Sequence, residues 1–156
     1  MLSTAPVRVL FVCLGNICRS PMAEGVMLKL LEERGLTDRF IVDSAGTAGY
    51  HAGESADRRT LAVLAREKAP VPSLSRRVQD SDFQSFDYIL AMDQANFSNL
   101  TARKPEHCEA ILALALETVG GGEVPDPYYG GPDGFENVYT LLHGSLSLWI
   151  DRMLSA

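Results

Sequence analysis

The sequence predicts an α/β fold in three layers, with an open sheet of four parallel strands flanked by helices. Four short apolar runs lack the polar–apolar alternation of half-exposed strands, which is typical of strands covered on both faces. Segments with apolar residues at helical spacing separate these runs. This alternation of strand and helix favours parallel strands joined by right-handed crossovers.

The first expected strand has a residue of special interest at its end. Cys13 closes the apolar run RVLFVC. In open parallel sheets, ligands bind at the carboxyl ends of strands, near a switch in strand order. Cys13 is therefore expected at the ligand-binding edge. The four expected strands are residues 8–13, 40–45, 87–92 and 108–114.

Helices are expected in each crossover and at the end of the chain. Pro21 suits the first turn of the first helix, and Gly35 suits its C-terminal cap. The last helix should pack on the sheet despite Gly144 in its middle. The expected helical segments are residues 20–35, 55–68, 92–103 and 132–154.

The composition indicates which cell compartment and which classes of partner to expect. The 156 residues fit one domain over residues 1–156. No apolar stretch approaches the ~20 residues that span a bilayer, and the N-terminal segment lacks the basic region of a signal peptide. We therefore expect a cytoplasmic protein without a membrane partner. A net charge of −6 without clustered Lys and Arg argues against nucleic acid, and three cysteines predict free thiols.

The segment after Cys13 has the features of a phosphate-binding loop. Backbone N–H groups of a loop between a parallel strand and a helix point inward, and the helix N-terminus adds partial positive charge. Gly15 adopts backbone angles that other residues cannot, and Asn16 tolerates the left-handed region. Arg19 offers a planar fork of donors that matches two phosphate oxygens.

The same surroundings favour a reactive thiol. Loop N–H groups, the helix terminus and Arg19 all stabilise the ionised form of Cys13, and Ser20 offers a hydroxyl donor to its sulfur. Most cysteines at strand ends serve only in packing. Here the loop context favours an ionised thiol at neutral pH instead.

A family resemblance extends over most of the chain. Residues 13–20, CLGNICRS, match the C-x5-R-S signature of the low-molecular-weight protein tyrosine phosphatases. C-x5-R alone is weak, because unrelated phosphatase folds also use it. Three more segments match in the same order: VDSAGTAGYHAG from residue 42, DYILAMD from residue 87 and PDPYYGG from residue 125. The chain therefore resembles this family closely.

The resemblance implies hydrolysis of protein phosphotyrosine and small aryl phosphates through a phosphocysteine intermediate. It implies Cys13 as the nucleophile, Arg19 as a ligand of the phosphoryl oxygens, and Asp126 as general acid and then base. Pro125 and Pro127 restrict the backbone around Asp126. No cofactor or metal is expected, inorganic phosphate is the expected product, and the protein is expected to be a monomer or weak oligomer that acts on phosphotyrosine-containing proteins.

The implied substrate pocket is a flat apolar slot that selects an aryl ester over phosphoserine. Tyr128 and Tyr129, in the Gly- and Pro-rich loop over residues 118–134, correspond to one wall and Tyr50 to the opposite rim. The predicted substrate-binding residues are Leu14, Gly15, Asn16, Ile17, Cys18, Ser20, Tyr50, Tyr128 and Tyr129.

A support network beneath the loop is also implied. Ser44 corresponds to a family serine that holds Asn16. Many relatives have a histidine in this network, whereas this chain offers Ser73, so the network must close differently, for example through water. For Cys18 two roles stay open: inert packing, or a reversible disulfide with Cys13 after peroxide attack.

Two other functions stay open as alternatives. Thiol-dependent arsenate reductases share the fold and the loop, but they relay a disulfide through further cysteines, and only Cys108 follows Cys18 here. A phosphotyrosine-binding module without turnover would lack the nucleophile or the acid, and this chain has both.

The remaining polar residues have simpler expected roles. The histidines lack the spacing of a metal site and are expected to be exposed or packed on helices. Arg58 and Arg59 are expected on a solvated helix face, with contact to acidic phosphopeptides at the pocket rim as the alternative. The histidines are His51, His107 and His143.

Overall fold

The computed structural model describes residues 5–128, 130–131 and 133–156. In chain order the elements are β1 (Val7–Cys13), α1 (Arg19–Arg34), the 3-10 turn η1 (Thr37–Arg39), β2 (Phe40–Gly46), α2 (Arg58–Arg66), α3 (Asp82–Ser85), β3 (Tyr88–Ala91), α4 (Gln94–Arg103), β4 (Ile111–Leu114), the 3-10 turn η2 (Glu117–Val119) and α5 (Gly134–Ser155).

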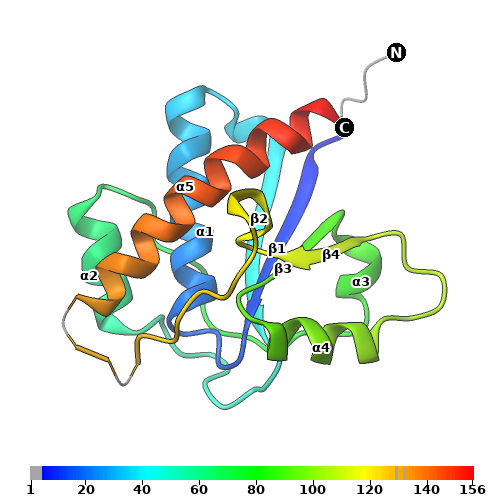
Figure 1. Ribbon diagram of the computed structural model, residues 1–156, viewed down its shortest axis with the longest axis horizontal. Helices are drawn as coiled ribbons and strands as arrows, with labels where there is room; N and C mark the ends of the chain where they lie inside the picture. The colour runs from blue at the N-terminus through cyan, green and yellow to red at the C-terminus, as the bar shows by residue number, and fades with distance from the viewer. Residues whose placement is uncertain (1–4, 129, 132) are drawn as a thin grey trace.

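The sheet has four strands in the order β2-β1-β3-β4, and all three pairings are parallel. This confirms the predicted fold class. The chain leaves β1 toward β2 on one side and later returns to β3 on the other, so the strand order switches at the carboxyl end of β1 (Figure 1). Cys13 lies at this switch point, where open α/β sheets bind ligands.

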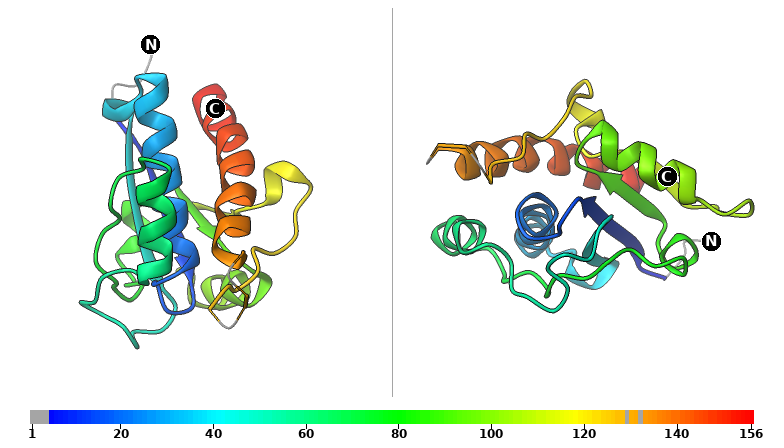
Figure 2. Two further views of the ribbon diagram at one scale, coloured as in Figure 1. Left: turned by 90° about the vertical axis from the view of Figure 1, so that its left-hand side faces the viewer. Right: turned by 90° about the horizontal axis from the view of Figure 1, so that it is seen from below.

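Two hydrophobic clusters cover the two faces of the sheet. Helices α1, α2 and α5 lie on one side and α3 and α4 on the other (Figures 1 and 2). Successive residues of β1 alternate between the clusters: Val9 and Phe11 join the first, whereas Leu10 and Val12 join the second. All four are fully buried, which explains why the run shows no polar alternation.

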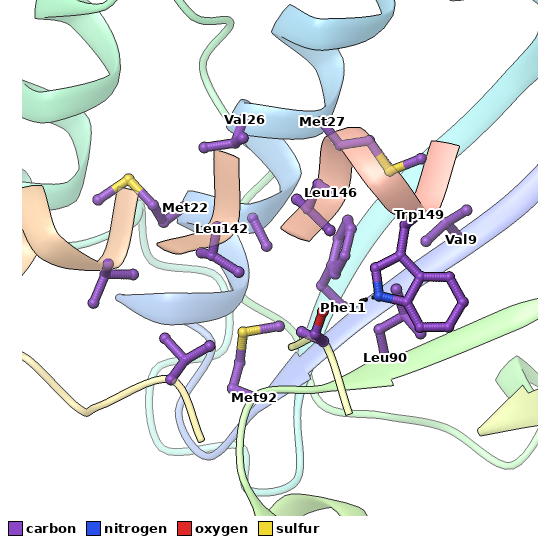
Figure 3. Close-up of a cluster of buried hydrophobic side chains, with 14 of the residues drawn as sticks. Val9, Phe11, Met22, Val26, Met27, Leu90, Met92, Leu142, Leu146 and Trp149 are labelled. Carbon is purple, nitrogen blue, oxygen red and sulfur yellow. Dashed lines mark hydrogen bonds between the residues drawn. The ribbon is translucent and has the colours of Figure 1, made fainter. Parts of the chain in front are cut away.

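Helix α5 closes the first cluster. Trp149 packs edge-on against Tyr88 of β3, with ring centroids 6.0 Å apart, and its Nε1 donates to the Ala115 carbonyl at 2.9 Å. Figure 3 shows Trp149 in this cluster beside Val9 and Leu90. Gly144, where a Cβ atom would meet open space, lies on the outer face of the helix. The glycine therefore leaves the packing face of α5 intact.

The predicted elements differ from the observed ones mainly at their ends. The expected strand over residues 108–114 forms its ladder only from Ile111, and Gly35 caps α1 with a φ of 68° as predicted. Among the residues that the structure describes, no helix has both the length and the apolar character needed to cross a membrane.

Candidate active site

The loop between β1 and α1 wraps around the sulfur of Cys13. The backbone N–H of Asn16 points at Sγ from 3.3 Å, and Ser20 Oγ lies 3.0 Å from the same sulfur, within hydrogen-bonding distance. Asn16 has a φ of 57°, which places its backbone in the left-handed region that Asn tolerates. The loop thus turns its donors toward the sulfur.

Neither of the two glycines at this loop has a positive φ, and Gly46 is the one at which a side chain would lack space. Gly15 was expected to supply a forbidden angle, but it is not among the positive-φ glycines; a Cβ there would lie 3.3 Å from His51 Cδ2. Gly46, which the sequence did not single out, ends β2 beside the loop. A Cβ at Gly46 would lie 2.6 Å from the Leu14 carbonyl oxygen and 2.8 Å from that of Ala48.

Asn16 ties the loop to the rest of the protein. It is 1% exposed, and its Nδ2 donates to Ser20 Oγ at 2.8 Å and to Ser44 Oγ at 3.0 Å. Its Oδ1 accepts from the Arg76 backbone N–H at 3.0 Å, and its carbonyl accepts a hydrogen bond from the Ser75 hydroxyl. A buried side chain with this many partners fixes the loop in one conformation.

Glu24 closes the network on the far side of Ser44. Its Oε1 accepts from Ser44 Oγ at 2.7 Å, and its Oε2 accepts from the Ser73 backbone N–H at 2.9 Å. Ser73 therefore closes the network by direct contact with Glu24.

The Ser73 hydroxyl also bears on the protonation of Glu24. Its Oγ lies 2.8–2.9 Å from both carboxylate oxygens of Glu24 and from Asp43 Oδ1. One hydroxyl proton can be donated to only one carboxyl group at a time, so a proton on one of the two carboxyl groups would relieve the contact with the other. Arg76 pairs with Asp43 at 3.1 Å, whereas burial raises the pKa of Glu24. Glu24 therefore takes up a proton more readily than an exposed glutamate does.

Arg19 is held at the start of α1 with its guanidinium facing the pocket. Its side chain is 6% exposed, and Nη1 donates to Asp93 Oδ2 at 2.8 Å and to the Val124 carbonyl at 3.0 Å. Asp93 in turn caps α4 by accepting from the Asn96 N–H. Arg19 Nη2 lies 4.0 Å from Asp126 Oδ2, which brings together residues 107 positions apart in the chain.

Asp126 lies on the opposite rim. Its side chain is 51% exposed, and Oδ1 accepts from the Tyr128 backbone N–H at 3.1 Å. Between this rim and the loop lies a pocket of about 270 Å³. The residues that line it are Cys13, Leu14, Gly15, Ile17, Cys18, Arg19, Tyr50, His51, Asp126 and Tyr128.

The structure divides the predicted substrate-binding residues into two groups. Asn16 and Ser20 are buried and lie under the pocket rather than along its wall, whereas the others that are described line it. Tyr129 falls outside the described residues. His51 was expected to be exposed or packed on a helix; it lines the pocket instead, with Nδ1 3.2 Å from Glu54 Oε2. Its position directly after Tyr50 was the available signal.

The other cysteines have different surroundings. Burial, with smaller contributions from Asp57 and Cys13, raises the pKa of the Cys18 thiol to about 12, so Cys18 is a neutral thiol at neutral pH. Cys108 precedes β4, at the end of the parallel sheet opposite to Cys13, and its sulfur lies 3.3 Å from the Phe83 carbonyl oxygen. Within the described part of the chain, no three His, Cys, Asp or Glu side chains gather as a metal site.

Comparison with known proteins agrees with this geometry. A family model described as low molecular weight phosphotyrosine protein phosphatase matches residues 8–155. The chain belongs to this family. Cys13 and Arg19, in the loop after β1, fit the mechanism of the low molecular weight phosphatases.

Individual relatives cover nearly the whole chain. The low molecular weight phosphotyrosine protein phosphatase of Schizosaccharomyces pombe is 47% identical over 143 residues, covering 89% of this chain and 92% of its own length. The human protein of the same name is 40% identical over 145 residues, covering 89% and 90%. A crystal structure of protein tyrosine phosphatase from Entamoeba histolytica, with Hepes in the active site, superimposes with a TM-score of 0.91 at 43% identity, covering 96% and 97%.

Proposed function

We propose that the chain hydrolyses phosphotyrosine in proteins, and small aryl phosphates, in two steps through a phosphocysteine. The observation that carries this proposal is the placement of Asp126 across the pocket from Cys13, with the guanidinium of Arg19 between the two sides. A nucleophile, an anion-binding loop and a proton donor thus converge on one space. Such an arrangement fits in-line transfer of a phosphoryl group.

In the first step, the Cys13 sulfur attacks phosphorus, and the S–P bond forms as the bond from phosphorus to the phenolic oxygen breaks. Asp126 gives its proton to that oxygen, so that a neutral phenol leaves. Arg19 and the loop N–H groups bind the three remaining oxygens, whose charge they stabilise through the transition state.

In the second step, water attacks the phosphorus of the phosphocysteine. Asp126, now a carboxylate, takes a proton from the water, and the S–P bond breaks to release inorganic phosphate. The Ser20 hydroxyl, 3.0 Å from Sγ, stabilises the departing thiolate. Asp126 ends protonated, ready for the next cycle.

The pocket shape supports selection of an aryl ester. Tyr50 and Tyr128, which are 76% and 41% exposed, stand at its mouth, and Leu14 and Ile17 also line it. A phosphotyrosine ring is long and flat enough to contact these side chains while its phosphate reaches Cys13. Phosphoserine has a shorter side chain and no aromatic ring, so it would not make these contacts while its phosphate reaches Cys13.

The direct test is a steady-state comparison of three substrates: a phosphotyrosine peptide, the matched phosphoserine peptide, and arsenate with excess thiol. We expect turnover of the phosphotyrosine peptide alone. Arsenate reduction without phosphotyrosine hydrolysis would favour the arsenate reductase alternative. Binding without turnover would favour the binding module.

The Cys13→Ser variant tests the nucleophile. We expect it to abolish turnover while it still binds inorganic phosphate, because the loop donors remain. Acid-quenched wild-type enzyme should carry phosphorus on Cys13 when examined by mass spectrometry. Substantial turnover by the variant would reject the assignment.

Three finer features belong to the same proposal: a single domain, a cytoplasmic setting and redox sensitivity.

The redox sensitivity concerns Cys18, which lines the same pocket as Cys13. The charge of Cys13 contributes to the raised pKa of Cys18. Hydrogen peroxide would oxidise Cys13 to a sulfenic acid, which condenses with the Cys18 thiol to a disulfide and releases water. The disulfide would protect Cys13 from further oxidation. A dithiol should therefore restore activity to the wild type after peroxide treatment, and should restore less activity to the Cys18→Ser variant, in which this disulfide cannot form.

A further inference from the structure

Arg59, the second residue of α2, joins three segments that are far apart in the sequence. Its guanidinium carbon lies 5.2 Å from the ring centroid of Tyr128 and 4.5 Å from that of Phe135. Its Nη1 also donates to the Tyr128 carbonyl oxygen at 3.2 Å. Arg59 therefore links α2 to the Asp126 loop and to the first turn of α5, which lies beside α2 in Figure 1.

Asp57 holds the guanidinium in place. Nε of Arg59 donates to Asp57 Oδ1 at 3.0 Å, and Nη2 donates to Oδ2 at 2.9 Å, so the contact is bidentate. Asp57 also accepts from the Arg59 backbone N–H and so caps α2. The hydrogen bonds and charge of Arg59 hold the pKa of Asp57 below its usual value, so Asp57 stays ionised at neutral pH.

Asp57 is in turn attached to the nucleophile loop. Its backbone N–H donates to the Ile17 carbonyl at 2.8 Å. A continuous set of contacts therefore runs from Ile17 through Asp57 and Arg59 to Tyr128. It ends at Asp126, whose Oδ1 accepts from the Tyr128 N–H. These contacts connect the two sides of the pocket outside the substrate path.

We propose that Arg59 is a positioning residue that keeps Asp126 in place through Tyr128. This inference rests on the proposed function, in which Asp126 must reach the leaving oxygen. Half-exposed carboxylates lose orientation easily, and a general acid must lie within hydrogen-bonding reach of its target. Arg59 supplies that orientation by stacking on the Tyr128 ring and by binding the Tyr128 carbonyl.

The rival role for Arg59 is direct recognition of acidic phosphopeptides. The contacts favour positioning, because three of its nitrogens are engaged with Asp57 and Tyr128. A charge paired bidentately with a carboxylate attracts a further anion weakly. Arg58 is the matched control: it is the adjacent residue, it is exposed, and its removal changes the net charge by the same amount.

The experiment compares wild type, Arg59→Ala, Arg59→Lys and Arg58→Ala on aryl phosphates whose leaving phenols differ in pKa. We expect Arg59→Ala to lower kcat/KM about 10- to 100-fold for phenyl phosphate and phosphotyrosine, and much less for nitrated phenyl phosphates, whose leaving groups need little protonation. Arg59→Lys keeps the positive charge but loses the bidentate contact with Asp57, so its kcat/KM should lie between those of the wild type and Arg59→Ala. Arg58→Ala should match the wild type, and inhibition by inorganic phosphate should stay within twofold in all four proteins.

A structural role alone would not change the dependence on the leaving group. An equal loss for all phenols, or an equal loss in Arg58→Ala, would therefore overturn the inference. Hydrogen–deuterium exchange of the segment from Val124 to Tyr128 provides a readout independent of turnover. We expect faster exchange in Arg59→Ala than in the wild type or Arg58→Ala, and unchanged exchange in Arg59→Ala would also overturn the inference. Absence of turnover in the wild type would instead reject the proposed function.

Discussion

The two sides of the pocket differ in burial and in the number of contacts that hold them. On the loop side, Cys13, Asn16, Arg19 and Ser20 are at most 5% exposed, and Asn16 alone has five polar partners across four segments. On the opposite side, the Asp126 side chain is 51% exposed. The phosphate-binding side is thus part of the core, whereas the proton-donating side is attached to it at the surface. Substitutions on the phosphate-binding side should lower both stability and turnover, whereas substitutions on the proton-donating side should lower turnover alone.

A large effect on chemistry without a loss of stability is expected from the exposed side. We expect Asp126→Asn to lower kcat/KM for phosphotyrosine by about two to four orders of magnitude, because the amide cannot donate a proton to the leaving oxygen. The thermal midpoint and the inhibition constant for inorganic phosphate should stay close to those of the wild type. A marked loss of thermal stability would show that this side is as integral to the fold as the loop.

A smaller effect is expected from Gly46 on the buried side. We expect Gly46→Ala to destabilise the fold by about 1–3 kcal/mol, because the added Cβ would press on the Leu14 and Ala48 carbonyls, which are backbone atoms with little freedom to move. Denaturant unfolding measures this loss, and phosphate affinity should fall with it. Gly144→Ala, at a position with open space, serves as the control and should not destabilise.

The smallest expected effect concerns pH and Glu24. Burial raises the pKa of Glu24 in the folded state above the ordinary 4.5. Protonated Glu24 therefore contributes fully to the free energy of unfolding below pH 4.5, and this contribution is lost as pH rises through the folded pKa. Glu24→Gln remains neutral at every pH. The thermal midpoint of the wild type, relative to this variant, should therefore decline as pH rises across that range.

The opposite slope would place Glu24 among the carboxylates that are ionised in the fold. Midpoints for both proteins, measured at matched ionic strength from pH 4 to 8, distinguish the two cases. Ser73→Ala provides a second check, because it removes the hydroxyl that contacts both Glu24 and Asp43.

Much of this architecture follows from local sequence features. The apolar runs predicted the strands correctly, because both faces of the sheet are covered. The segment from Cys13 to Ser20 could be recognised because its geometry depends on neighbours in the chain. The family resemblance implied some contacts between distant segments, such as that of Ser44 with Asn16, but others escaped prediction. Gly46 is required only because β2 meets the nucleophile loop, His51 reaches the pocket only because of where its loop lies, and Arg59 contacts Tyr128 across 69 positions.

The central position of β1 has a practical consequence for following the protein in solution. The strand that ends in Cys13 is hydrogen-bonded on both edges and contributes residues to both hydrophobic clusters. The sulfur cannot leave its place without disrupting the middle of the sheet. Catalytic turnover is thus a sensitive reporter of global integrity, and inactivation well before unfolding would point to local damage, either at the exposed rim or by oxidation of Cys13.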